Sequence, residues 1–209
     1  MDAHKIIERY KRFNLNLDVT DSSGTYLAQL LPINNSLINN MSMITQLTKW
    51  RNRSMRFFKS QFNATEESTQ NWLKNIQLPS NDRILFLVSF ENKFVGHYGL
   101  CNITNNSAEL DNALRGERGG PSDLFKWVEH TLIRFAFDEL KVNKISAMVL
   151  SLNFLALRMH KDLGFKENNR FPLSINEFNE KKEYKITSIE NANTEIEYIE
   201  LIFLKSQYN

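Results

Sequence analysis

The sequence has little of what identifies several large classes of protein. Cys101 is the only cysteine among 209 residues, which excludes an intrachain disulfide and is typical of a reducing compartment. No apolar run approaches the ~18 residues that a transmembrane helix needs, and the N-terminal stretch MDAHKIIERYKRF lacks the apolar core of a signal peptide. The net charge is only +2, too small for a general nucleic-acid binder. We therefore expect a cytoplasmic protein without a membrane or nucleic-acid partner.

Glycine is also scarce, and its distribution is uneven. Three of the seven glycines fall in RGERGGPS, residues 115–122, together with two arginines and directly before an amphipathic segment. Glycine lets the backbone approach a ligand closely, and the start of a helix presents unpaired N–H groups to anions. The stretch is therefore either a plain surface turn or an anion-binding loop.

The rest of the composition is that of an ordinary globular protein, 42% hydrophobic and 24% charged, and its length suits one domain over residues 1–209. After a short N-terminal helical or irregular piece, the hydrophobic periodicity predicts strands mixed with helical segments. The strands are expected at 25–33, 83–91, 93–104, 107–116, 144–153, 182–189 and 197–206, and the helical segments at 41–78, 122–140 and 154–164. This order predicts an α/β (α+β) domain with a mixed sheet.

Capping residues mark the expected helix ends. Thr65 is the expected N-cap of the helix that contains EESTQNW, with Ser68 in the place of a capping-box glutamate, so no capping box is expected. Ser122 or Asp123 can cap the long helix that follows the glycine-rich stretch. Gly164 is suited to stop the second helix.

The order of these parts resembles the GCN5-related N-acetyltransferase (GNAT) family. In that family a strand, a glycine-rich pyrophosphate loop and a long helix precede a further strand and a short helix ending in Gly-Phe. Here SLNFLALRMHKDLGFKE is similar to the family pattern through Asn153, Ala156 and Gly164–Phe165. The resemblance covers residues 83–167. It implies a GNAT fold, a central, mixed and mostly antiparallel twisted sheet flanked by helices, with acetyl-coenzyme A as the acetyl donor and no metal.

The glycine-rich loop departs from the family pattern at one position. Arg115 and Gly120 match its first and last places, but Arg118 stands where the middle glycine belongs. The N–H groups of residues 118–123 can still surround a pyrophosphate, with a charge-assisted contact from Arg118. Asn153 resembles the family residue that contacts the cofactor arm, and it is equally suited to cap the next helix. The implied donor site contains Leu114, Arg115, Gly116, Arg118, Gly119, Gly120, Ser122 and Asn153.

Acetyl transfer needs a neutral amine and an acid for the departing thiolate. His160 stands where the family has an aromatic hydroxyl, so its imidazolium is the candidate acid, unless it only hydrogen-bonds a carbonyl. Glu109 and Asp111 share one face of strand 107–116, whose backbone the resemblance pairs with pantetheine. They and His97 are the candidate bases, and the sequence does not choose among them. Cys101 lies in an apolar run, as a buried, unreactive thiol would, and no paired base is evident, which argues against a covalent intermediate.

The acceptor site is expected in KWRNRSMRFF, residues 49–58. Arginine can bind phosphate bidentately, and tryptophan or phenylalanine can stack on a base. The alternative is a basic helix face beside the core. The WRN triplet resembles family members that acetylate amino sugars on nucleotide carriers and members that act on protein N-termini. The candidate acceptor residues are Trp50, Arg51, Asn52, Arg53 and Arg56.

These patterns predict an acetyl-coenzyme A-dependent N-acetyltransferase that acts by direct transfer. The expected acceptor is the amino group of a nucleotide-linked amino sugar in surface polysaccharide biosynthesis, because the glycine-rich loop resembles those of polysaccharide acetyltransferases. Acetylation of a protein N-terminus, a ribosomal protein or another small amine is the first alternative. A non-catalytic sensor that binds coenzyme A is the alternative from another class. A homodimer through the C-terminal strands is left open.

Overall fold

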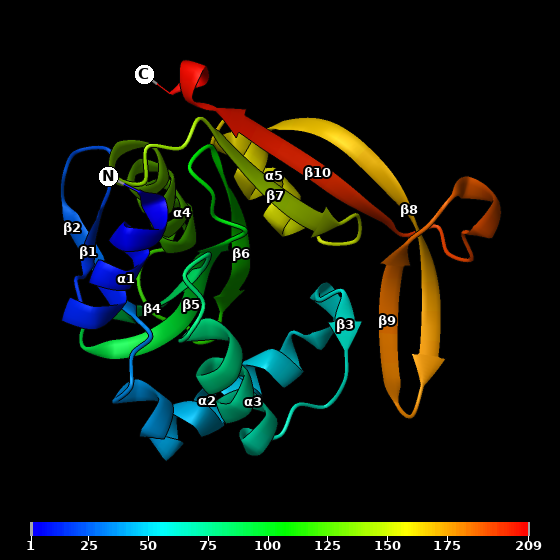
Figure 1. The fold of residues 1–209 in the computed structure, drawn as a ribbon, viewed down its shortest axis with the longest axis horizontal. Helices are drawn as coiled ribbons and strands as arrows, with labels where there is room; N and C mark the ends of the chain where they lie inside the picture. Colours follow the sequence, from blue (N-terminus) through cyan, green and yellow to red (C-terminus); the bar gives the residue numbers. More distant parts are fainter. Residues whose placement is uncertain (1, 209) are drawn as a thin grey trace.

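A mixed sheet forms the centre of the computed structural model, which describes residues 2–208. The strands are β1 (Leu17–Thr20), β2 (Tyr26–Pro32), β3 (Ser60–Gln61), β4 (Ile84–Phe90), β5 (Lys93–Cys101), β6 (Ser107–Arg115), β7 (Lys144–Leu150), β8 (Lys166–Phe178), β9 (Lys181–Ile186) and β10 (Glu197–Leu204). Their spatial order is β1-β2-β4-β5-β6-β7-β10-β8-β9-β3 (Figure 1). Within residues 2–208, β6 and β7 are the one parallel pair. The predicted mixed, mostly antiparallel sheet is confirmed.

Helices cover both faces of this sheet. They are α1 (Ala3–Phe13), α2 (Met41–Arg53), α3 (Glu66–Trp72), α4 (Leu124–Arg134) and α5 (Phe154–Asp162), and π-helical turns extend α3 to Gln77 and α4 to Glu139. The helices α1, α4 and α5 share one hydrophobic core, and α2 and α3 pack into a second core on the opposite face. No helix in the described part of the chain is long and apolar enough to cross a membrane.

Strand β4 explains how the two cores are separated. Ile84, Phe86 and Val88 belong to the core under α1 and α4, whereas Leu85 and Leu87 belong to the core under α2. All five are almost fully buried. A strand buried on both faces gives a continuous apolar run in the sequence rather than an alternating one, which is why this strand was predictable.

The helical segment predicted over 41–78 is wrong in its middle. Between α2 and α3 the chain extends, and Ser60 and Gln61 of β3 pair with β9. The expected absence of a capping box is also wrong. The Ser68 amide donates to Thr65 Oγ1 (3.1 Å), and the Thr65 amide donates back to Ser68 Oγ (2.9 Å). A serine hydroxyl therefore completes the reciprocal pair that glutamate usually forms.

Strand β8 was absent from the sequence prediction. Its first half pairs with β10 and its second half with β9, so that β8 and β9 project as an arm beside β3 (Figure 1). Most of its residues are exposed, and asparagine and glutamate are depleted in strands, so pairing with neighbours overrides local propensity here. Strand β10 is paired on both edges, by β7 and β8. The two edges of β10 are therefore taken within the chain, and a homodimer through the C-terminal strands stays a prediction.

A β-bulge in β6 changes which face of the sheet its later side chains occupy. His97 pairs with Leu114 and Gly99 with Asp111, so β6 has one residue more than β5 over this stretch. Asn112 adopts the left-handed conformation, with a φ of 54°, as asparagine tolerates. Leu110 accordingly packs in one core and Leu114 in the other. The bulge lies just beyond the last pair that joins β6 to β7.

Substitution of Asn112 tests whether the bulge depends on the left-handed backbone. Asn112→Ala and Asn112→Gly both lose the side-chain amide, which donates to the Asp111 carboxylate. Only alanine meets the steric penalty at positive φ, so we expect Asn112→Gly to be more stable by about 1 kcal/mol in urea unfolding. Ala113→Gly is the control, because glycine should destabilise that neighbouring position. Equal stability of the two Asn112 variants would contradict this interpretation.

Candidate active site

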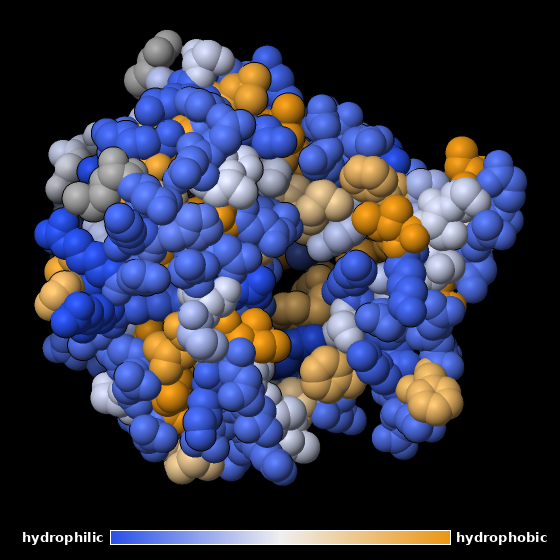
Figure 2. Space-filling model, viewed as in Figure 1, coloured by the Kyte–Doolittle hydropathy of each residue, from blue (hydrophilic) through white to orange (hydrophobic). Residues whose placement is uncertain are grey.

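A cavity of about 690 Å³ opens where β6 and β7 diverge. The parallel pairing runs from Ser107 with Lys144 to Leu110 with Ala147, and it stops there. Beyond this point both strands line the cavity, together with α5 on one side and the α2–β3 segment on the other. Figure 2 shows this hollow between the body of the molecule and the segment that carries β3. The predicted donor strand and acceptor segment therefore face the same space.

The glycine-rich loop is held in shape by Arg115. Its guanidinium donates to the carbonyl oxygens of Gly119 (2.7 Å), Pro121 (3.2 Å) and Ser122 (2.9 Å). Among residues 2–208, the backbone N–H groups of 118–120, 122 and 123 have no acceptor. A loop whose carbonyls are bound and whose amides are free is the arrangement that an anion requires. Gly120 has a φ of 70°, a conformation that disfavours other residues.

Helix α4 begins at Leu124, two residues later than expected, and has no side-chain cap. The Asp123 carboxylate instead accepts a hydrogen bond from Trp127 Nε1 (2.9 Å). The Ser122 hydroxyl is likewise not a cap, since Asp123 is the N-cap residue. The amides at this helix start therefore lack the side-chain partner that the sequence predicted.

The end of α2 is fastened to the same loop. A Cβ at Gly116 would lie only 2.0 Å from the Trp50 indole, so only glycine fits against that ring. Trp50 Nε1 donates to Glu117 (2.7 Å), and Arg53 donates to the Gly116 carbonyl and pairs with Glu117. A second, smaller cavity beside this contact is lined by Arg53, Arg115, Gly116, Glu117 and Arg118.

Asn153 and His160 come to the cavity from α5. Asn153 is the N-cap of this helix, since its side-chain oxygen accepts from the Ala156 amide (3.3 Å), and strand β7 ends earlier than predicted, at Leu150. His160 lines the cavity but is only 3% exposed. Its Nδ1 donates to the Glu129 carboxylate (2.7 Å), so its partner is a carboxylate rather than a carbonyl.

The three candidate bases all line the cavity but differ in electrostatics. Burial raises the pKa of Glu109 and of Asp111. Burial lowers the pKa of His97 to about 4, and its Nδ1–H donates to the Asn112 carbonyl (2.7 Å). His97 is therefore a neutral, weakly basic imidazole, whereas the two carboxyl groups are stronger bases than ordinary surface carboxylates.

Cys101 is a buried free thiol, as predicted. Burial, reinforced by the Asp111 and Glu109 carboxylates, raises its pKa. The group therefore stays protonated and is a poor nucleophile. In the described part of the chain, no three His, Cys, Asp or Glu side chains gather as a metal site would require.

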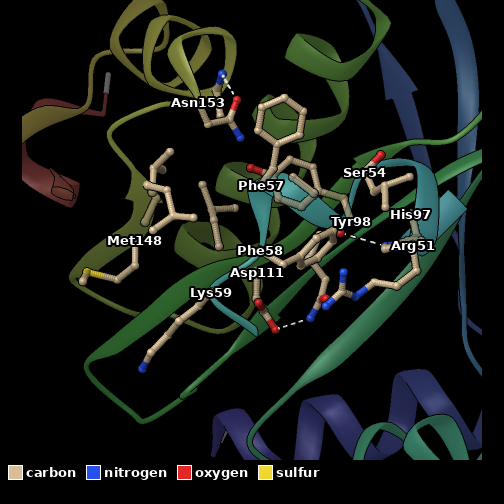
Figure 3. Close-up of a pocket in the computed structure, with 18 of the residues that line it drawn as sticks. Arg51, Ser54, Phe57, Phe58, Lys59, His97, Tyr98, Asp111, Met148 and Asn153 are labelled. Carbon is tan, nitrogen blue, oxygen red and sulfur yellow. Dashed lines mark hydrogen bonds between the residues drawn. The ribbon is translucent and has the colours of Figure 1, made fainter. Parts of the chain in front are cut away.

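Arg51 is the one predicted acceptor residue that lines the main cavity (Figure 3). Its guanidinium lies 3.8 Å from the ring centroid of Phe58 and 5.2 Å from that of Phe62, and Nη2 donates to the Ser60 carbonyl. Nη1 is buried without a hydrogen-bond partner in residues 2–208. Burial lowers the Arg51 pKa to about 10, so the group stays charged near neutral pH.

The other predicted acceptor residues lie elsewhere. Trp50 is buried under the glycine-rich loop, and Asn52 exchanges two hydrogen bonds with the backbone of Ala64. Arg53 is held at Gly116 and Glu117, and Arg56 is exposed with its guanidinium over Phe57. The KWRNRSMRFF segment thus divides into residues that line the cavity, Arg51, Ser54, Phe57 and Phe58, and residues that hold the surrounding framework.

Sequence reasoning missed several groups that line the cavity. They are Phe62, Trp72, Tyr98 and Tyr198, as well as Lys59. Tyr98 lies next to the predicted His97, and its hydroxyl donates to Glu129 (2.9 Å). Glu129 is a carboxylate within the apolar stripe of α4, and that unusual position was the signal in the sequence.

Comparison with known proteins agrees with this geometry. Residues 42–166, more than half of the chain, match the family model described as the acetyltransferase (GNAT) domain. The chain belongs to the GNAT family. It is an acetyl-coenzyme A-dependent N-acetyltransferase, which confirms the predicted donor and reaction class. The GNAT chain is 28% identical over 128 residues to the acetyltransferase PseH of Campylobacter jejuni, covering 60% of this chain and 78% of that protein.

Solved structures show the same fold. The crystal structure of Campylobacter jejuni N-acetyltransferase PseH in complex with acetyl-coenzyme A has a TM-score of 0.56 and 18% identity, covering 86% of this chain and 99% of PseH. Spermidine N-acetyltransferase from Vibrio cholerae, in complex with coenzyme A and spermine, has a TM-score of 0.66 and 17% identity, with 87% and 98% covered. At these identities the likeness supports the fold and not the acceptor.

Arg115 can be tested as the residue that shapes the donor loop. We expect Arg115→Ala to weaken acetyl-coenzyme A binding about tenfold, measured by calorimetry, because the released carbonyls no longer hold the amides in place. Arg158→Ala is the matched control, since Arg158 is exposed on α5, where it pairs with Asp162. Unchanged donor affinity in Arg115→Ala would contradict this role.

Proposed function

We propose that this N-acetyltransferase acts on the amino group of a nucleotide-linked amino sugar, as the sequence resemblance implies. The observation that carries the proposal is Arg51, whose buried Nη1 has no partner among residues 2–208 and whose guanidinium lies near the rings of Phe58 and Phe62. An unpaired buried N–H costs free energy that an incoming anion would recover. A phosphate on Arg51 and a flat base beside Phe58, Phe62 or Trp72 fit one ligand, a nucleotide.

The donor is proposed to enter between β6 and β7, with its pyrophosphate at the amides of residues 118–123. The backbone of β6 beyond Leu110 has left β7 and is free on that edge to pair with an extended arm. Leu114 and Asn153 line the cavity on opposite sides of this opening. Gly116, Gly119 and Gly120 let the loop pack closely on Trp50, Val95 and Leu124, and Arg118 adds charge.

His160 and a carboxylate are proposed to handle the two protons. The amine nitrogen attacks the thioester carbonyl, forming the C–N bond as the C–S bond breaks. Glu109 or Asp111 takes the proton from the amine, directly or through water, and His160 gives a proton to the departing thiolate. Direct attack requires no nucleophile from the protein.

Acceptor choice can be tested with a thiol-release assay on a panel of amines. We expect release with nucleotide-linked 3- or 4-amino sugars and little with free amino sugars, short peptides or spermidine. With the preferred acceptor, Arg51→Gln should raise KM about tenfold or more and leave kcat within about threefold, because a charged hydrogen bond to phosphate is lost.

Two variants make this test specific. Arg51→Lys retains the positive charge but loses the two parallel N–H donors of the guanidinium, so the KM for the acceptor should also rise. Arg56→Gln, five residues after Arg51, changes an exposed arginine outside the cavity lining and should behave like the unaltered protein. Thiol release with peptides or spermidine alone, unaffected by Arg51→Gln, would reject the nucleotide-sugar proposal in favour of the small-amine alternative.

The identity of the base is tested by the pH dependence of kcat/KM. A base must be ionised, so activity should fall as pH falls through its pKa, and burial places that fall above the ~4 of an ordinary carboxyl. Glu109→Gln or Asp111→Asn, whichever removes the base, should lower kcat/KM by about 10²- to 10⁴-fold and abolish this acidic limb. His97→Gln should retain it. Loss of the limb in His97→Gln alone would overturn the assignment.

A further inference from the structure

Three side chains from three elements meet behind His160. Its Nδ1 donates to Glu129 Oε1 on α4 (2.7 Å), and Tyr98 on β5 donates from its hydroxyl to Glu129 Oε2 (2.9 Å). The three are 3%, 0% and 1% exposed, respectively. Both oxygens of the buried carboxylate therefore have a partner, as a buried carboxylate requires.

In this network, it is fixed which groups donate and which accept the hydrogen bonds. Burial, reinforced by Glu129, raises the pKa of Tyr98, so its hydroxyl stays protonated and donates. Glu129 can then act as acceptor from both neighbours, and the proton on the core side of His160 stays on Nδ1. No protein group in residues 2–208 bonds to Nε2, and the ring lines the main cavity. The arrangement turns one nitrogen of His160 to the core and leaves the other for a ligand.

We propose that Glu129 is a positioning residue for His160, with Tyr98 fixing Glu129. The proposal rests on the proposed role of His160 as the acid. The carboxylate holds the ring orientation and stabilises the imidazolium, in the way that an acid oriented by a third group works in other enzymes. When His160 passes its Nε2 proton to the thiolate, it becomes the neutral Nδ1–H tautomer, still bonded to Glu129, and it regains a proton from water in the cavity.

A double-mutant cycle separates positioning from a merely structural role. We expect His160→Ala to lower kcat about 10²-fold or more and Glu129→Gln, which is nearly isosteric, about tenfold or more, with the KM for acetyl-coenzyme A changed less than threefold. In the His160→Ala background, Glu129→Gln should change kcat less than twofold, because its effect passes through His160. Additive losses would overturn the proposal.

Two further variants control for stability. Tyr98→Phe removes only the hydroxyl and should lower kcat by less than Glu129→Gln does. Thr131→Val lies two residues from Glu129 on the same helix and is also buried, and its hydroxyl has no partner within residues 2–208. It should leave kcat unchanged. If Thr131→Val lowers kcat as much as Glu129→Gln does, helix packing explains the loss and the proposal fails.

Nitrogen-15 NMR of the His160 ring gives a readout independent of turnover. In the unaltered protein, the neutral ring should carry its proton on Nδ1. A proton on Nε2 instead would overturn the positioning role even if His160→Ala is inactive. If the tautomer is as expected but His160→Ala keeps full kcat, the assignment of His160 as acid fails, and the role of Glu129 in catalysis fails with it. Neither result bears on the acceptor, which the panel of amines tests separately.

Discussion

The backbone of β6 leaves β7 after Leu110, and the candidate site is built on this divergence. Each strand keeps its other neighbour, β5 for β6 and β10 for β7, so the sheet stays intact on both sides of the opening. Strand edges that face the opening have peptide groups in need of partners. An extended ligand with its own amides meets that need better than a compact one. The bulge at Asn112 strengthens the local twist and brings Leu114 to the second core.

The donor and acceptor sides are mechanically joined through α2. The Trp50 indole packs against Gly116 without room for a side chain, and Arg53 and Glu117 add polar contacts to the same place. Arg51, which follows Trp50 in α2, lines the main cavity. A shift of the glycine-rich loop would therefore move the residue that is proposed to bind the acceptor. Rigid packing of this kind transmits displacement because a close-packed contact has no slack.

Much of the architecture follows from the sequence because local pattern and tertiary environment agree. The apolar run of β4, the amphipathic α4 and the Gly164 stop of α5, with its φ of 99°, each follow from one local rule. The prediction failed where tertiary pairing decides. Strand β8 is polar and exposed, and β3 has two residues, so neither has a hydrophobic period to detect.

The candidate site was predictable in its residue types more than in their orientation. Arg53 and Trp50 are about one helical turn apart, so both lie near the same face of α2. Whether that face meets the cavity depends on how α2 packs on the glycine-rich loop, and the spacing of the residues does not show this. The carboxylates of Glu109 and Asp111 could be proposed as a pair because strand alternation puts them on one face of β6. The partner of His160 was not found, because Glu129 is 31 residues away and on another helix.

Two charged groups at the site, Glu129 and Arg51, differ in how far the protein satisfies their hydrogen bonds. Glu129 has both oxygens bonded within the protein, so the orientation of His160 is complete before any substrate arrives. Arg51 is unfinished, with Nη1 buried and unpartnered in the described chain. A group that must keep one geometry throughout a reaction gains from preorganised partners, because no reorganisation is then needed at the moment of proton transfer. A group that recognises a ligand gains from an unsatisfied hydrogen-bond donor. A substrate without the matching anion leaves that donor unpaired, and the free-energy cost of the unpaired donor then disfavours its binding. Satisfied hydrogen bonds therefore suit the positioning role proposed for Glu129, and an unsatisfied one suits the recognition role proposed for Arg51.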